Sequence, residues 1–232
     1  MKYERILAIG AHVGDAELTC GGVLASCAAA GGHIATLALT AGEKGNPKNI
    51  TVEDYRLQKI READEFAGIL KGSAYVLDYP DGDLPFNDKI RFEICDLIRK
   101  ERPDLILTHH ASSMHRDHEQ CCRLAKEGWF LASQPGFVRK DPAKFAPLRF
   151  AENWEDSTGF TPYKYIEVTG EGFKLWQEAV QKLWFVTGST SFPYYEYYCH
   201  LKRIRGIEAR KAYAEAYMCL PEETRLITSF EA

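Results

Sequence analysis

The sequence predicts an α/β fold: a Rossmann-like parallel sheet flanked by helices, completed by a smaller, mainly helical C-terminal part. Two observations predict it. Short apolar runs alternate with segments of helical periodicity over residues 1–134, which is typical of consecutive βαβ units. The run 33–40 is apolar almost throughout, as in strands that are covered on both faces. We expect 1–232 to form a single domain, with 1–134 as its Rossmann-like core and 135–232 completing it.

The elements of the core follow from these patterns in order. We expect strands at 6–9, 33–40, 74–79 and 103–108, and helices at 23–30, 51–70, 87–100 and 118–132. Thr51 begins the second helix, because its hydroxyl can cap the backbone and two acidic residues follow. Beyond Pro135 we expect a fifth strand at 163–168, helices within 173–186 and 194–217, and a closing edge strand at 225–230.

The composition excludes several kinds of partner. The net charge is −4 and the pI is about 6.0, which leaves no basic field for nucleic acid or an anionic membrane. No apolar run approaches the roughly 20 residues that span a bilayer. The seven cysteines form no regular framework, which favours reduced thiols and a cytoplasmic protein. Aromatic residues near the C-terminus favour a homo-oligomer.

A histidine and a carboxylate follow the first expected strand. His12 and Asp15 lie in the turn at its carboxyl end, where open α/β sheets bind ligands. His115 and His118 follow the fourth strand and are expected at the same edge. Two imidazoles and one carboxylate, with an open position for water, form a recurring catalytic zinc set. The residues alone leave both metal binding and a chance pattern open, because an H-x-x-H pair also arises by chance.

Several motifs resemble those of the PIG-L/LmbE-like family of zinc-dependent N-deacetylases. Residues 11–22 align without a gap with the family's AHPDDE signature and the GG pair that follows it. Further matches occur in order at 40–45 (T-x-G-E-x-G), 79–82 (PDG), 102–104 (RPD), 115–118 (HPDH) and 205–215 (RG…YAE). The resemblance implies a hydrolase that removes the acetyl group from a small N-acetylated amino sugar or sugar conjugate.

The resemblance also implies the roles of the histidine motifs. His12, Asp15 and His118 would bind Zn²⁺, with Fe²⁺ as the alternative because a His₂-carboxylate set suits both ions. His115 would polarise the substrate carbonyl or stabilise its oxyanion, and would protonate the leaving amine. Asp117 would orient the His115 imidazole.

Three further residues are candidates for substrate binding. Glu43 lies in the glycine-rich loop after the second strand, and Asp81 lies in the turn after the third. The family places a substrate-contacting arginine on the helix 51–70, and Arg56 or Lys59 is its counterpart. For Glu43 the alternative is a structural role, in which its carboxylate satisfies backbone donors of the loop.

One position departs from the family's motif. Gly14 stands where the family has its general-base aspartate, and a glycine cannot take a proton from water. Three interpretations follow: another carboxylate takes the proton (Glu17, Glu43, Asp81 or one in the run 152–156), His115 acts as both base and acid, or the site catalyses poorly. We favour a working enzyme with a rearranged base. Glu17 has a structural explanation as well as the catalytic one, because the helix dipole favours an acidic residue at the start of a helix.

Other classes of protein compete with this interpretation. Gly14 also motivates a non-catalytic or weakly active protein that binds a sugar or metabolite through the metal. A nucleotide-binding Rossmann protein is less favoured, because G-x-G-x-x-G is absent and no acidic residue closes the second strand. A structural zinc site is the third alternative, and it predicts that chelators unfold the chain.

Overall fold

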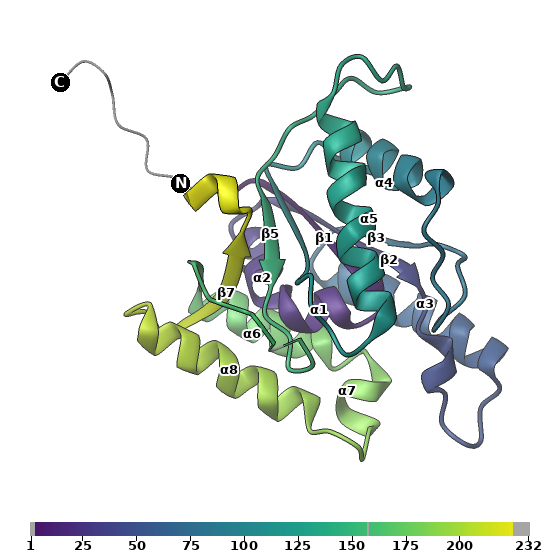
Figure 1. Cartoon of the computed structure of the whole chain (residues 1–232). Helices are drawn as coiled ribbons and strands as arrows, with labels where there is room; N and C mark the ends of the chain where they lie inside the picture. The colour runs from purple at the N-terminus through teal and green to yellow at the C-terminus, as the bar shows by residue number, and fades with distance from the viewer. Residues whose placement is uncertain (1–2, 157, 225–232) are drawn as a thin grey trace.

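A seven-stranded sheet lies at the centre of the computed structural model, which describes residues 3–156 and 158–224 (Figure 1). Its strands follow the order β3-β2-β1-β4-β5-β7-β6. Their bounds are β1 Arg5–His12, β2 His33–Thr40, β3 Ser73–Val76, β4 Leu105–His109, β5 Leu148–Ala151, β6 Lys164–Val168 and β7 Tyr213–Cys219. Strands β1 to β5 pair in parallel, and β7 pairs antiparallel with both β5 and β6.

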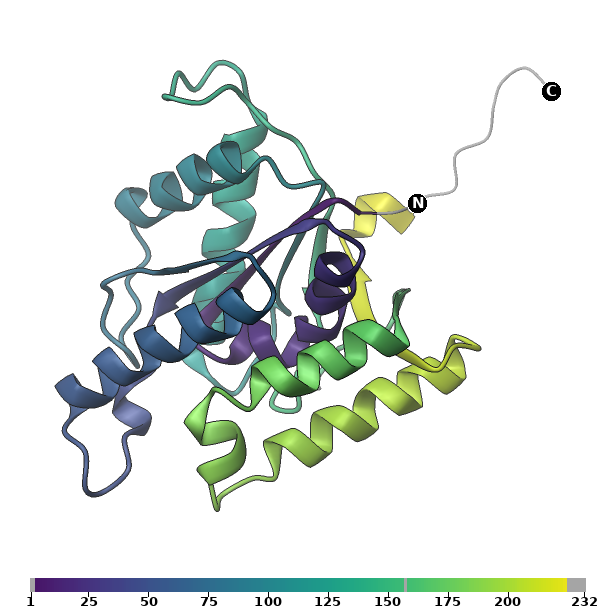
Figure 2. The ribbon, with the colours of Figure 1, turned by 180° about the vertical axis from the view of Figure 1, so that it is seen from behind.

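The helices lie in two layers on either side of this sheet (Figures 1 and 2). Their bounds are α1 Asp15–Thr19, α2 Gly21–Ala29, α3 Val52–Ile69, α4 Asp88–Glu101, α5 Arg116–Ser133, α6 Gly170–Val180, α7 Trp184–Gly188 and α8 Tyr194–Glu208, with 3-10 turns at Glu43–Gly45 and Pro221–Thr224. Helices α4 and α5 pack against each other on one face. Helices α2, α3, α6 and α8 cover the other.

Strand β1 shows why both faces are buried. Leu7 and Ile9 pack into the core beneath α4 and α5, whereas Ile6 and Ala8 pack into the core beneath α2 and α6. Successive side chains of a strand point to opposite faces, so a continuous apolar run fills two cores at once. The expected α/β fold and the first four strands are therefore confirmed, and the carboxyl ends of β1 and β4 lie side by side.

The C-terminal third differs in detail from the expectation. The expected helix 194–217 ends at Glu208, and its last residues belong to strand β7. The expected helix 173–186 is interrupted, giving α6 and the short α7, and strand β5 was not expected. The strand expected at 163–168 is present as β6. The edge strand expected at 225–230 lies outside the described residues.

Two simpler expectations concern membranes and thiols. Within residues 3–156 and 158–224, no helix has the length and apolarity that crossing a bilayer requires. None of the seven cysteines forms a disulfide, and six of them are buried. They therefore contribute to the fold as small apolar side chains.

Candidate metal centre and active site

The turn between β1 and α1 presents the first pair of donors. Gly14 has a φ of +113°, a conformation that side chains disfavour, and its N–H donates to Glu17 Oε2 at 2.8 Å. Asp15 begins α1, and its Oδ2 accepts from the His12 backbone N–H at 2.8 Å. This tight turn leaves His12 and Asp15 facing the cavity beyond the sheet edge.

His118, from the first turn of α5, completes a three-residue group with this pair. Asp15 Oδ2 lies 3.2 Å from His12 Nδ1 and 3.5 Å from His118 Nε2. One donor atom from each of the three residues lies within 4.8 Å of the others. Two nitrogens and a carboxylate oxygen fit the preferences of Zn²⁺ or Fe²⁺. The structure thus brings together the three ligands that the motifs predicted.

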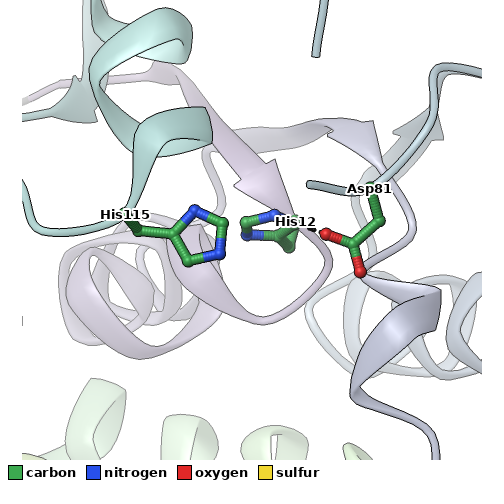
Figure 3. A group of neighbouring side chains, drawn as sticks. All are labelled: His12, Asp81 and His115. Atoms are coloured by element: carbon green, nitrogen blue, oxygen red, sulfur yellow. Dashed lines mark ion pairs between the residues drawn. The ribbon is translucent and has the colours of Figure 1, made fainter. Parts of the chain in front are cut away.

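The second nitrogen of each imidazole faces a carboxylate. His12 Nε2 lies 3.1 Å from Asp81 Oδ1 and 3.4 Å from Asp117 Oδ2, while His118 Nδ1 lies 3.5 Å from Asp156 Oδ1. Figure 3 shows the His12 ring between Asp81 and His115. Carboxylates in this position fix the orientation of metal-binding histidines and make them stronger ligands. The arrangement is therefore a candidate metal site in which each imidazole has a carboxylate beside its second nitrogen.

His109, at the end of β4, joins the same cluster. Its Nε2 lies 3.0 Å from Asp15 Oδ2, its Nδ1 lies 3.5 Å from Asp156 Oδ2, and its ring stacks on His118 at 4.1 Å. The motifs did not single it out. Its position in the sequence could have indicated it, because His109 ends the strand that pairs with β1 and so lies at the same sheet edge as His12. Two other donor groups also overlap the cluster: His12, Asp81 and His115, and His109, His118 and Asp156.

The charges of the cluster stabilise one another. Burial opposes the charge of Asp15, but His118, His12 and His109 outweigh it and hold the pKa of Asp15 well below its ordinary value. Burial likewise lowers the pKa of His12, yet Asp15, Asp117 and Asp81 raise it well above its ordinary value. The same balance, led by Asp15, raises the pKa of His109 to about 9. Asp15 therefore stays ionised beside the imidazoles that surround it.

His115 and Asp117 lie at the start of α5. The His115 ring lies 4.8 Å from that of His12 and 4.7 Å from that of His118. Its Nδ1 accepts from the Asp117 backbone N–H at 3.2 Å. The Asp117 carboxylate accepts from the N–H groups of Gly82 and Leu84, at 2.7 and 3.2 Å, and faces His12. Asp117 thus reaches His115 through its backbone and His12 through its side chain.

The remaining predicted residues differ in their relation to the cavity. Asp81 lines it and faces His12, with its Oδ2 accepting from the Lys44 N–H at 2.7 Å. Glu43 is buried, and its Oε1 accepts from the Asp81 N–H at 3.1 Å. Arg56 pairs with Glu43 at 3.5 Å and with Asp78 at 2.6 Å. Glu43 and Arg56 therefore support the turn that carries Asp81. Glu17 is buried beneath the first turn, as a cap on Gly14.

The cavity, of about 490 Å³, has a polar and an aromatic side. The polar side carries His12, Asp15, Asp81, His115 and His118. The other side, here called the aromatic wall, consists of Tyr55, Trp154, Trp184, Phe185 and Tyr194. Large flat faces beside hydrogen-bonding groups suit a small ring-shaped or planar ligand.

Two charged side chains line the cavity besides the cluster. Lys59 is buried, donates to the Val13 carbonyl at 2.5 Å and lies 4.1 Å from the centre of the Phe185 ring. Burial lowers its pKa. Glu155, half-buried on the segment after β5, also lines the cavity. Burial, with the nearby Asp15 and Asp156 carboxylates, raises the pKa of Glu155 to about 7.

A doubly covered sheet with imidazoles and carboxylates gathered at one strand edge defines the class: an α/β protein with a candidate metal site at the carboxyl ends of its strands. The family model described as PIG-L, GlcNAc-PI de-N-acetylase, matches residues 7–129, more than half of the chain. The chain belongs to this family. The match includes His12, Asp15, His115 and His118, and it ends before the segment that carries Glu155.

Similar proteins include deacetylases and a hydratase. The diacetylchitobiose deacetylase of Thermococcus kodakarensis is 29% identical over 143 residues, which cover 60% of this chain and 54% of that protein. The match thus spans about half the length of this curated relative. The fold is shared with the 4-carboxy-2-hydroxymuconate hydratase GalB of Pseudomonas putida KT2440, with a TM-score of 0.85, 22% identity and coverage of 99% of this chain and 100% of that one. It is also shared with the N,N′-diacetylchitobiose deacetylase of Pyrococcus horikoshii, with a TM-score of 0.80, 19% identity and coverage of 99% and 88%.

Proposed function

We propose that the protein is a metal-dependent hydrolase that removes the acetyl group from a small N-acetylated amino sugar or sugar conjugate in the cytoplasm. The convergence of His12 Nδ1, Asp15 Oδ2 and His118 Nε2 carries the proposal, with a carboxylate behind each imidazole. The deacetylase named among its relatives supports the substrate class. Zn²⁺ is the expected ion and Fe²⁺ the alternative.

The chemistry divides between the bound ion and the residues around it. When bound, the ion supplies a polarised carbonyl and a water of lowered pKa. His115, whose ring lies 4.8 Å from that of His12 and 4.7 Å from that of His118, donates a hydrogen bond to the oxyanion that develops on the amide in this proposal, an interaction typically worth about 2.7–4 kcal/mol. The aromatic wall orients the sugar ring and excludes water from one of its faces. Asp81 is positioned to hold His12 and to meet a substrate hydroxyl.

A second candidate function is the hydration of a carbon–carbon double bond. The GalB hydratase matches this chain over almost its whole length, including the C-terminal third that forms most of the aromatic wall. Hydration uses the same activated water but has no leaving amine. The absence of a side chain at Gly14 favours this alternative, because the deacetylase motif has its base there.

Acetate release separates the two functions. The Zn²⁺-loaded protein is assayed with N-acetylglucosamine and N,N′-diacetylchitobiose, and with 4-carboxy-2-hydroxymuconate for loss of its ultraviolet absorbance. Acetate release that His118→Ala abolishes, together with that variant's loss of bound metal, supports the deacetylase. Turnover of the muconate alone supports the hydratase. Tight metal binding with no turnover of any of the three contradicts both and leaves a metal-dependent binding protein.

A further inference from the structure

The segment 152–156 after β5 forms part of the cavity, and most of its side chains are held by neighbours. The Glu152 carboxylate pairs with Arg205, whose Nε donates at 2.8 Å. Asn153 Oδ1 accepts from the Tyr198 hydroxyl at 2.6 Å. The ring of Trp154 stacks on Phe192 at 4.2 Å. These contacts fix the backbone on one side of Glu155.

The other side of Glu155 is fixed as well. The Asp156 N–H donates to the Asn153 carbonyl at 3.1 Å, and its Oδ2 accepts from Asn153 Nδ2 at 3.3 Å. The Asp156 carboxylate is fully buried between His109 and His118. Glu155 therefore projects into the cavity from a rigid support, which is what a group that moves protons requires.

Glu155 has no such partner of its own. In the ranges 3–156 and 158–224, no hydrogen bond or ion pair engages its carboxylate. It lines the same cavity as His12, Asp15 and His118. The other two carboxylates that line the cavity are engaged, because Asp15 meets three imidazoles and Asp81 meets His12 and the Lys44 N–H.

The position that the family motif uses for its base is closed. A Cβ built on Gly14 would lie 2.4 Å from the Cε1 and Cζ atoms of Phe185, well inside van der Waals contact. The ring of Phe185 thus fills the volume where a side chain at position 14 would project. A proton acceptor for the attacking water has to come from another part of the cavity.

We propose that Glu155 is the catalytic residue that transfers the proton. This inference rests on the proposed function. The water oxygen bonds to the amide carbon, the π electron pair of the carbonyl moves to its oxygen, and one water proton passes to the Glu155 carboxylate. The carbonyl bond then re-forms as the C–N bond breaks, the C–N electron pair goes to nitrogen, and the same proton passes from Glu155 to that nitrogen. The products are the free amine and acetic acid, which keeps the second water proton until it passes to the amine or to solvent. The Glu155 carboxylate is thereby regenerated.

The test compares three substitutions at Glu155 on the N-acetylated sugars. Glu155→Gln keeps the size of the side chain and removes the acceptor, so we expect kcat to fall by about 10²–10⁴-fold with little change in KM. Bound zinc, measured by elemental analysis, stays at the wild-type level. Glu155→Asp retains part of the rate. Added formate partly restores the turnover rate of Glu155→Ala, because it can enter the space that the side chain vacates. It does not restore the rate of Glu155→Gln, where that space is filled. Glu178→Gln, an exposed residue of α6, is the matched control.

The outcomes separate the two proposals. Wild-type kcat in Glu155→Gln contradicts the role of Glu155 and leaves the proposed function intact. A loss of rate that formate does not restore in Glu155→Ala, or that comes with loss of zinc, also contradicts it. A wild-type protein that releases no acetate contradicts the proposed function, and the same variants are then compared in the hydratase assay. Inactivity of the wild type in both assays overturns both proposals.

Discussion

The ring of Phe185 in α7 lies against Gly14 in the turn after β1, where a Cβ on the glycine would come within 2.4 Å of two ring carbons. A residue of the C-terminal third thereby determines what the first motif of the chain can contain. The interpretation of Gly14 as a simple loss of the base is therefore incomplete, because aromatic volume has replaced the space for it.

Gly14→Asp is expected to destabilise the protein without creating a base. The φ of +113° is strained for aspartate, which costs about 1–3 kcal/mol, and overlap with Phe185 adds about 1–3 kcal/mol. Urea unfolding measures the loss. Gly136→Asp is the control, since a Cβ at Gly136 meets nothing within 4 Å. The double variant Gly14→Asp/Phe185→Ala should recover only the part of the stability loss that comes from overlap with the Phe185 ring, and not the part that comes from backbone strain. Wild-type stability of the single variant would show that α7 moves freely.

Removal of the metal is expected to abolish activity and leave the fold in place. The donors project from β1, α1 and α5, whose cores on both faces of the sheet contain no metal-dependent contact among the described residues. Circular dichroism after treatment with a chelator should keep its helical signal, and re-addition of Zn²⁺ should restore turnover. Unfolding by the chelator would instead indicate a structural zinc site.

Lys202→Met is expected to cost about 3–5 kcal/mol, because it leaves the Glu215 carboxylate in the core without its counter-ion. The two side chains lie 3.1 Å apart and are 2% and 4% exposed. Lys211→Met is the matched control: Lys211 pairs with Glu167 at 2.9 Å at the surface, where such pairs contribute about 0–1 kcal/mol. If Lys202→Met and Lys211→Met lose the same unfolding free energy in urea, burial of the ion pair does not explain the cost.

The Glu101 carboxylate is expected to make stability depend on pH. Burial raises its pKa, but hydrogen bonds with Tyr75 and His33 outweigh burial, so the folded-state pKa lies below the ordinary 4.5. A lowered pKa stabilises the fold above the unfolded-state value, and this contribution is lost as the pH falls through the folded-state value. Glu101→Gln should therefore lose more unfolding free energy at about pH 7 than at about pH 4, measured in urea. The same loss at both pH values would rule out the ionised form as the cause.

The central fold could be predicted because its strands are continuous apolar runs. Strand β7 could not, since Ala214, Glu215 and Ala216 are residues that favour helices in isolation. Pairing with β5 and β6 overrides that preference, and the burial of Glu215 against Lys202 is visible only in three dimensions. Local propensity fails where long-range pairing decides the structure.

The residues of the site that belong to a recognisable motif could be predicted from the sequence. His12, Asp15 and His118 come together because the carboxyl ends of β1 and β4 are adjacent. Asp156 was included only as part of an acidic run, and its contact with His118 depends on β5 lying beside β4. The role of Phe185 could not be predicted from the sequence, because its contact with Gly14 arises from the packing of α7 over the turn.

The place of β7 in the sheet ties the late part of the chain to its first motif. Strand β7 lies between β5 and β6, and it brings Glu215 to the N–H groups of Gly22 and Val23 at the start of α2. The helix that follows the turn of His12 and Asp15 is thus anchored by a strand from the other end of the chain. The position of the metal donors therefore depends on a residue that lies 193 positions beyond Gly22 along the sequence.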